Sequence, residues 1–112
     1  MTAGAGRRPR VTIAELRLDC KRTFSRYYLD LSSPGVPTPT EAYEACAAYL
    51  AARRRDLGET LFWLQLDHEV EQLAGEVEQD LRFRRLEGLV EHLAREPVEA
   101  RLRECIEAGL RR

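Results

Sequence analysis

Residues 59–81 read ETLFWLQLDHEVEQLAGEVEQDL, a stretch without proline whose apolar side chains recur at helical intervals. The recurring positions are 62, 66, 70, 73, 77 and 81. This spacing is typical of one face of an α-helix and differs from the alternation of a strand. After Leu81 the phase slips, because the next apolar series is Phe83, Leu86, Val90 and Leu93. We therefore predict a kink or break near residues 79–82. If the helix breaks there, Asp80 is the expected N-cap. Residues 59–95 then form either one kinked helix or two helices.

A first helix is predicted on the N-terminal side, from Thr12 to Leu31. Thr12 and Glu15 form a T-x-x-E capping box, in which both side chains bond free backbone amides. Apolar residues then recur at helical spacing as far as Leu31, where the prolines and glycine of residues 32–37 end the helix. Residues 1–10 contain glycine, proline and arginine without apolar periodicity, and we predict a flexible basic tail there.

A second helix is predicted to begin at Thr38-Pro39-Thr40-Glu41, which combines a capping threonine, a first-turn proline and a glutamate. Gly58 is well placed to end it. Alanines fill much of this helix, so a neighbouring helix can approach it closely. A last helix begins near Glu96-Pro97, and no segment alternates like a strand. The predicted fold is all-α, a compact bundle of four to five helices that forms one domain over residues 11–112.

Length and composition narrow the class of protein. A chain of 112 residues makes one domain. Its longest apolar run, residues 45–52, is too short to span a bilayer, and no apolar segment follows the basic start as in a secretory signal. We expect a cytoplasmic protein that does not act at a membrane. Of its 18 basic residues 17 are arginine, which the codon usage of a GC-rich bacterial genome explains better than selection for bidentate binding.

Nucleophilic catalysis has little support in the sequence. It contains no G-x-S-x-G elbow and no glycine-rich phosphate loop. Cys20, Cys46 and Cys105 each fall on the apolar face of a predicted helix, where a thiol packs as a small hydrophobic group. We therefore predict that all three cysteines are core residues.

Two histidines give the one visible route to metal chemistry. His68 is followed by Glu71 and His92 by Glu96, so each pair can share a helical face. The order differs from the E-x-x-H of di-iron bundles, in which the glutamate comes first. We predict no metal, cofactor or small-molecule substrate, and a metal-binding bundle enzyme is the third hypothesis for function.

Apolar side chains exceed what one helical stripe can bury. Residues 61–64 are apolar on every side of their turn, and the first helix also has apolar residues off its main stripe. Large aromatic side chains are the usual anchors of protein interfaces. A helix buried centrally among four others would hide these residues as well. The predicted contacts with a protein partner or a second copy are Leu61, Phe62, Trp63, Leu64, Leu18, Tyr28 and Leu29.

Clusters of arginine raise the alternative of nucleic-acid binding. The candidate phosphate contacts are Arg7, Arg8, Arg10, Arg53, Arg54 and Arg55, and Arg82, Arg84 and Arg85 form a further cluster around Phe83. A slightly negative net charge argues against a nucleic-acid-binding domain. Cations at positions 53–55 are also favoured simply because they close a helix.

Charge is divided unevenly along the chain. Residues 56–80 carry eight acids and no base, whereas residues 1–55 carry ten bases and five acids. Such polarity can orient a partner or align subunits head to tail. The sequence thus favours a small helical protein-interaction module (an adaptor, assembly or regulatory subunit) that acts by binding and not by catalysis. A small DNA- or RNA-binding regulator is the alternative.

Overall fold

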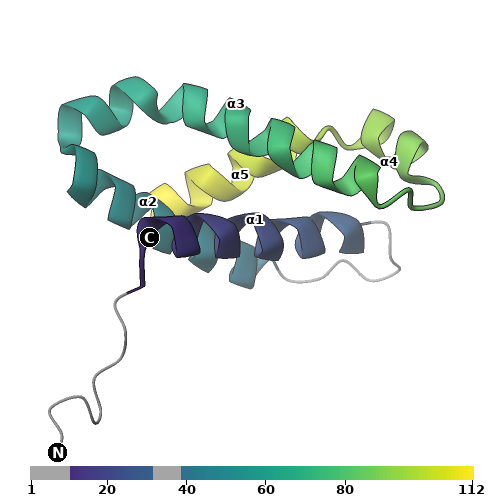
Figure 1. Cartoon of the computed structure of the whole chain (residues 1–112), viewed down its shortest axis with the longest axis horizontal. Coiled ribbons are helices and arrows are strands. Elements are labelled where there is room, and N and C mark those ends of the chain that lie inside the picture. The colour runs from purple at the N-terminus through teal and green to yellow at the C-terminus, as the bar shows by residue number, and fades with distance from the viewer. Residues whose placement is uncertain (1–10, 32–38) are drawn as a thin grey trace, which may run out of the picture.

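The computed structural model describes residues 11–31 and 39–112, and in this part of the chain it holds five α-helices and no strand (Figure 1). The helices are α1 (Ile13–Asp30), α2 (Thr40–Leu57), α3 (Glu59–Phe83), α4 (Leu89–Arg95) and α5 (Val98–Leu110). The all-α prediction is confirmed. The predicted basic tail at 1–10, with Arg7, Arg8 and Arg10, and the predicted cap at Thr38 lie outside the described residues.

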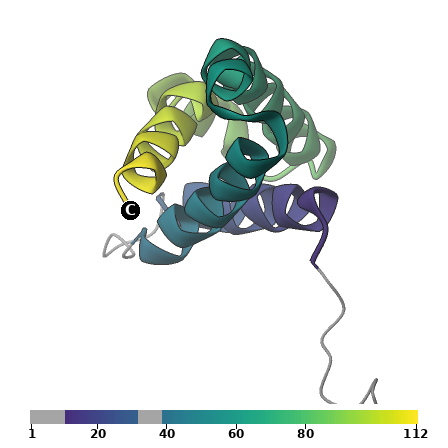
Figure 2. The same ribbon diagram turned by 90° about the vertical axis from the view of Figure 1, so that its left-hand side faces the viewer.

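Helix α2 is central to the packing, because it contacts both α1 and α5 along its length, while α3 packs chiefly on α5. Figure 1 shows α3 along one side of the molecule and α1 along the other, and Figure 2, which faces the corner where α2 turns into α3, shows that α5 lies to one side of both. All five helices contribute to one apolar core. Its largest fully buried side chains include Phe24, Tyr28, Tyr49, Leu73, Leu81 and Leu102.

Local chemistry sets two of the helix boundaries where the sequence predicted them. The Thr12 hydroxyl accepts a hydrogen bond from the Glu15 backbone amide at 3.1 Å, which caps α1. Gly58 separates α2 from α3 with a φ of +83°, a backbone conformation that favours glycine. Its N–H donates to the Arg54 carbonyl at 2.9 Å, so this one residue ends α2 and precedes the first turn of α3.

The predicted break is present but lies a few residues later than residues 79–82. Helix α3 continues to Phe83, and the break lies at residues 84–88, before α4. Asp80 does not cap a helix, since its carboxylate lies 3.4 Å from the Lys21 ammonium of α1. Leu81 is fully buried, and the helix continues through it to Phe83. Residues 59–95 therefore form two helices.

The second apolar series is also corrected. Phe83, Leu86 and Val90 are exposed, although they were assigned to one buried stripe with Leu93. Helix α4 instead buries Leu89, His92 and Leu93. The turn at 84–88 changes the direction of the chain. Helical spacing counted across this turn therefore does not identify the residues of α4 that face the core.

The three cysteines are completely buried, as predicted. Cys20 of α1 and Cys46 of α2 approach with their Sγ atoms 3.4 Å apart, and both are free thiols. Burial raises the pKa of the Cys105 thiol to about 12. These thiols pack as small core side chains.

Candidate interaction surface

The acidic segment 56–80 is largely neutralised inside the molecule. Arg17 of α1 forms a bidentate ion pair with Glu76 of α3, at 2.7 and 2.8 Å, and its Nε donates to Glu69 at 3.0 Å. Lys21 also donates to Glu76, at 3.1 Å. The hydrogen bonds from Arg17 lower the pKa of Glu76 to about 2, and those carboxylates raise the pKa of Arg17. These ion pairs therefore connect α1 to α3.

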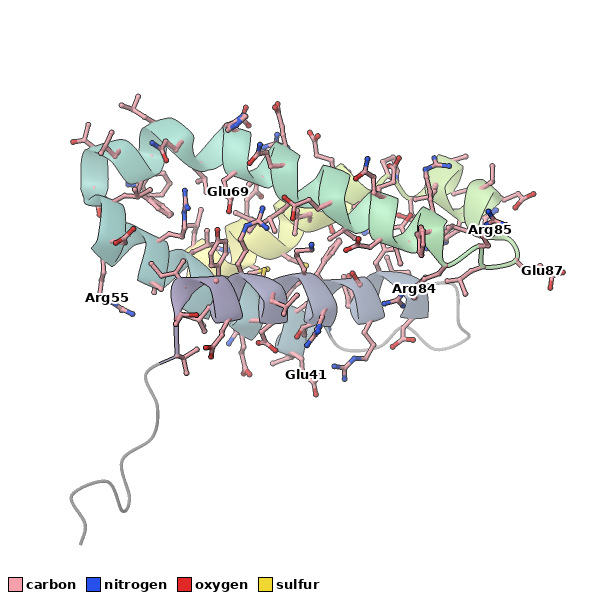
Figure 3. All side chains as sticks on the ribbon, in the orientation of Figure 1. Glu41, Arg55, Glu69, Arg84, Arg85 and Glu87 are labelled. Atoms are coloured by element: carbon pink, nitrogen blue, oxygen red, sulfur yellow. The ribbon has the colours of Figure 1, made fainter. Side chains whose placement is uncertain are left out.

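Glu69 lies on the side of α3 that faces α1 and α2 (Figure 3). Besides Arg17, it accepts a hydrogen bond from the buried Tyr49 hydroxyl of α2. Burial, followed by this contact, raises the pKa of Tyr49. A buried carboxylate needs such partners, because an unpaired one costs several kcal/mol. The network links α1, α2 and α3 through one acidic side chain.

Most other acids of segment 56–80 also have a basic partner within the chain. The pairs are Glu59 with Arg54, Asp67 with Arg103, Glu78 with Arg82 and Asp80 with Lys21. Within the described residues only Asp56 and Glu71 of this segment lack an ion pair. Much of the charge of this segment is therefore paired within the fold, and the expectation that the acidic segment orients a partner stays a prediction.

The predicted contact residues divide into exposed and buried groups. Leu61, Trp63 and Leu64 are 49%, 46% and 74% exposed, which is high for large apolar side chains. Phe62, beside them in sequence, is buried in the core. We call Leu61, Trp63 and Leu64 the α3 apolar patch, and Phe62 is removed from the predicted contact surface.

The contact residues predicted on α1 do not form one surface. Tyr28 is completely buried, so it is a core residue and not a partner contact. Its hydroxyl donates to the Glu96 carbonyl at 2.5 Å, and its ring packs edge to face with the His92 ring, with 4.7 Å between the ring centroids. The turn between α4 and α5 covers this side of α1, which local periodicity could not show. Leu29 is half-buried against the core, and Leu18 is partly exposed.

The Trp63 indole is held in a fixed orientation by its neighbours. Its Nε1–H donates to a Glu59 carboxylate oxygen at 2.6 Å, and Arg54 donates to the same carboxylate at 2.7 and 2.8 Å. The Arg54 guanidinium also lies 5.1 Å from the indole ring. Hydrogen bonds from Arg54 and then from Trp63 lower the pKa of Glu59 to about 2. In the sequence, the only sign of these hydrogen bonds is an arginine and a glutamate on either side of Gly58.

The α3 apolar patch wraps around the start of α3. Successive residues of a helix are turned by about 100°, so Leu61 and Leu64 lie on neighbouring lines of the outer face while Trp63 is turned towards α5. Beside Trp63 there is a hollow of about 220 Å³ between α3 and α5, bordered by Leu66 and Leu110. The patch therefore offers both a convex apolar ridge and a shallow cavity.

The predicted phosphate contacts at 53–55 do not act as one cluster. Arg54 is engaged with Glu59, and Arg53 donates to Gln65 at 3.4 Å. Arg55 has no ion pair with any described residue, and Figure 3 shows it extending from the corner of the bundle. Of the three, Arg54 contacts both Glu59 and the Trp63 ring, so its charge is used within the fold.

The two histidines lie in different environments. His68 is exposed on α3, whereas His92 is buried on α4 with its Nε2 3.2 Å from the Tyr28 carbonyl oxygen. Residues 11–31 and 39–112 contain no group of three or more His, Cys, Asp or Glu side chains suited to a metal ion. Within these residues, the pairs His68/Glu71 and His92/Glu96 therefore do not combine into one group of possible metal ligands.

No protein-family model matches this sequence, and no curated protein or solved structure is similar to it at a significant level. In the described part of the chain, no helix combines the length and the apolar character needed to cross a membrane. The function is therefore inferred from the surfaces of the chain itself.

Proposed function

We propose that this chain is a helical interaction module that acts by binding another protein, or a second copy of itself, through the α3 apolar patch. The observation that carries this proposal is the exposure of three large apolar side chains within one turn of helix, next to a fully formed core. Contiguous exposed apolar surface on a folded chain marks contact sites.

The free energy gained by burying the α3 apolar patch is smaller than the cost of association. Full burial of a large apolar side chain contributes roughly 1.5–3 kcal/mol, so covering three half-exposed ones contributes about 3 kcal/mol. Association costs about 4–15 kcal/mol in lost freedom of motion. The interface must therefore extend beyond the patch. The fixed orientation of Trp63 lowers the cost of ordering it on binding.

The test replaces Leu64, the most exposed member of the patch, by lysine. The matched control is Gln72→Lys, which adds the same charge to an exposed position two turns further along α3. Sedimentation velocity over a wide concentration range measures self-association of the wild type and both variants. Affinity capture from the native host, read by mass spectrometry, measures binding of other proteins.

The proposal expects one assembly, with itself or with a defined protein, that Leu64→Lys abolishes and Gln72→Lys retains. Circular dichroism and melting temperature should remain unchanged in both variants, because both positions are exposed. A wild type that stays monomeric, and whose captured proteins are the same with Leu64→Lys, would overturn it.

A further inference from the structure

A groove separates α1 from the C-terminal end of α3, at the end of the molecule away from the α2–α3 corner. It consists of two adjoining hollows of about 350 and 310 Å³, which share Arg22, Ser25 and Arg84 in their walls. Leu18 and Phe83 border the first hollow. The groove thus joins basic and apolar side chains from segments far apart in sequence.

The basic groups of this groove differ in their availability. Lys21 and Arg26 are each paired with a carboxylate of this chain. Arg22 and Arg84 are exposed and form no ion pair with any described residue. Figure 3 shows Arg84 at the end of α3, directed towards α1. Two guanidinium groups are therefore free to meet carboxylates from outside.

The apolar side chains of the groove are exposed to solvent. Phe83 is 89% exposed, and Leu18 on the opposite side of the groove is partly exposed. An exposed phenylalanine in the same hollow as two free arginines offers an apolar contact and charge-assisted hydrogen bonds side by side. A ligand that uses both must carry an anionic group next to an apolar one.

We propose that this α1–α3 groove binds an acidic peptide segment of a partner protein, with carboxylates at Arg22 and Arg84 and an apolar side chain between Leu18 and Phe83. This is a second surface, separate from the α3 apolar patch, and its test is independent of that patch. A short acidic and apolar segment is complementary to the groove in both charge and shape.

Two carboxylates of the groove distinguish this partner from a nucleic acid. Asp80 lines one hollow and Asp30 the other. A nucleic-acid strand carries a phosphate on every nucleotide and would bring these charges past both carboxylates, whereas a peptide can place its acidic side chains at Arg22 and Arg84 alone. A peptide also carries backbone N–H donors that can face Asp30 and Asp80. The mixed charge of the groove therefore favours a peptide.

The experiment pans a phage-displayed library of random 12-residue peptides against the full chain and against the double variant Arg22→Glu/Arg84→Glu. The proposal expects peptides enriched on the wild type alone, with Asp or Glu next to Leu, Ile, Phe or Trp. The most enriched peptide, synthesised with a fluorescent label, should bind about tenfold or more weakly to the double variant, because two charge-assisted contacts are lost. Phe83→Ala should weaken it further without altering helicity.

Charge-matched and site-matched controls separate this groove from other surfaces. The double variant Arg55→Glu/Arg111→Glu reverses the same charge near the α2–α3 corner and should bind the peptide as the wild type does. Leu64→Lys should also leave peptide binding unchanged, so failure of this proposal and failure of the proposed function are distinguishable. A library that yields no enriched peptide, enriched peptides without acids, or equal enrichment on the groove variant would overturn the proposal. Binding of a labelled 20-nucleotide dT strand that Arg22→Glu/Arg84→Glu abolishes, with no peptide enriched, would replace the peptide with single-stranded nucleic acid.

Discussion

Gly109 of α5 lies directly against the backbone of Ala47 in α2. A Cβ at Gly109 would stand 3.0 Å from the Ala47 nitrogen and 3.3 Å from its Cα. Backbone cannot move aside as the end of a flexible side chain can. The two helices therefore approach each other so closely that a Cβ at Gly109 would push the backbones of α2 and α5 apart by a few tenths of an ångström. The alanine content of residues 40–57 predicted this kind of approach, although not the residue that meets it.

Gly109→Ala should destabilise the fold even though alanine is the better helix former. The overlap with Ala47 should cost about 1–3 kcal/mol, which exceeds the helix-propensity gain of about 1 kcal/mol. Gly75→Ala on the exposed face of α3 is the control, because its Cβ would meet no atom within 4 Å. It should stabilise the protein by about 0.5–1 kcal/mol. Urea unfolding measures the change in unfolding free energy, which should be negative for Gly109→Ala and positive for Gly75→Ala. A Gly109→Ala variant as stable as the wild type would show that α2 and α5 are further apart.

The ion pair of Arg17 and Glu76 makes stability depend on pH in a defined window. The pKa of Glu76 falls from 4.5 to about 2 in the folded chain, so folding favours its ionised form. Its stabilising effect is present above about pH 4.5 and is lost as the pH falls towards 2. Because 38% of the Glu76 side chain is exposed, water screens the pair, and we expect about 1 kcal/mol at neutral pH.

Glu76→Gln tests this contribution by urea unfolding at several pH values. The difference in unfolding free energy between wild type and variant should be largest at pH 7 and shrink below pH 4.5. Glu71→Gln, at an exposed position of the same helix without an ion pair to a described residue, should give no such pH-dependent difference. A constant difference for Glu76→Gln down to pH 2 would contradict the lowered pKa.

The sequence predicted those features that depend on neighbours along the chain. The Thr12 cap and the Gly58 boundary involve contacts within four residues, so local chemistry decides them. Asp80 was misassigned as a helix cap because its carboxylate pairs with Lys21, far away in sequence. Tyr28 was misplaced because the turn before α5 covers it. Both errors arise where tertiary contacts override local periodicity.

The candidate surfaces were predictable to different degrees. The excess of apolar residues at 61–64 was visible as composition, but which of them faces outward depends on how α2 and α5 pack on α3. The arginines around Phe83 were also visible. Their juxtaposition with Arg22 depends on α1 lying beside the end of α3, a contact that no local pattern encodes.

The three buried cysteines should be unreactive in the native protein. Iodoacetamide at pH 8 and low temperature should label none of them without denaturant and all three in urea, because burial hides the thiols and raises the pKa of Cys105 to about 12. Val90→Cys introduces a thiol at an exposed position of α4 and should be labelled at once. Mass spectrometry counts the added groups. Rapid native labelling of Cys20, Cys46 or Cys105 would contradict the packed core.

Arg85 should be a position where glycine stabilises the fold. It follows α3 with a φ of +53°, the left-handed conformation, and its N–H donates to the Arg82 carbonyl at 3.1 Å. An L-residue with a side chain adopts this conformation at a cost of roughly 1–2 kcal/mol, whereas glycine adopts it without that strain. Glycine loses more freedom on folding, so Arg85→Gly should give a net gain of about 1 kcal/mol.

The neighbouring residue supplies the control for this last substitution. Arg84 has a φ of −71° in the right-handed region, so Arg84→Gly relieves no strain and should cost about 0.5–1 kcal/mol. Thermal unfolding should therefore move in opposite directions, with Arg85→Gly raising the melting temperature by about 4 °C and Arg84→Gly lowering it. Both substitutions remove one positive charge from the same turn, so a purely electrostatic effect would move both melting temperatures the same way. That outcome would show that Arg85 is not held in the left-handed conformation.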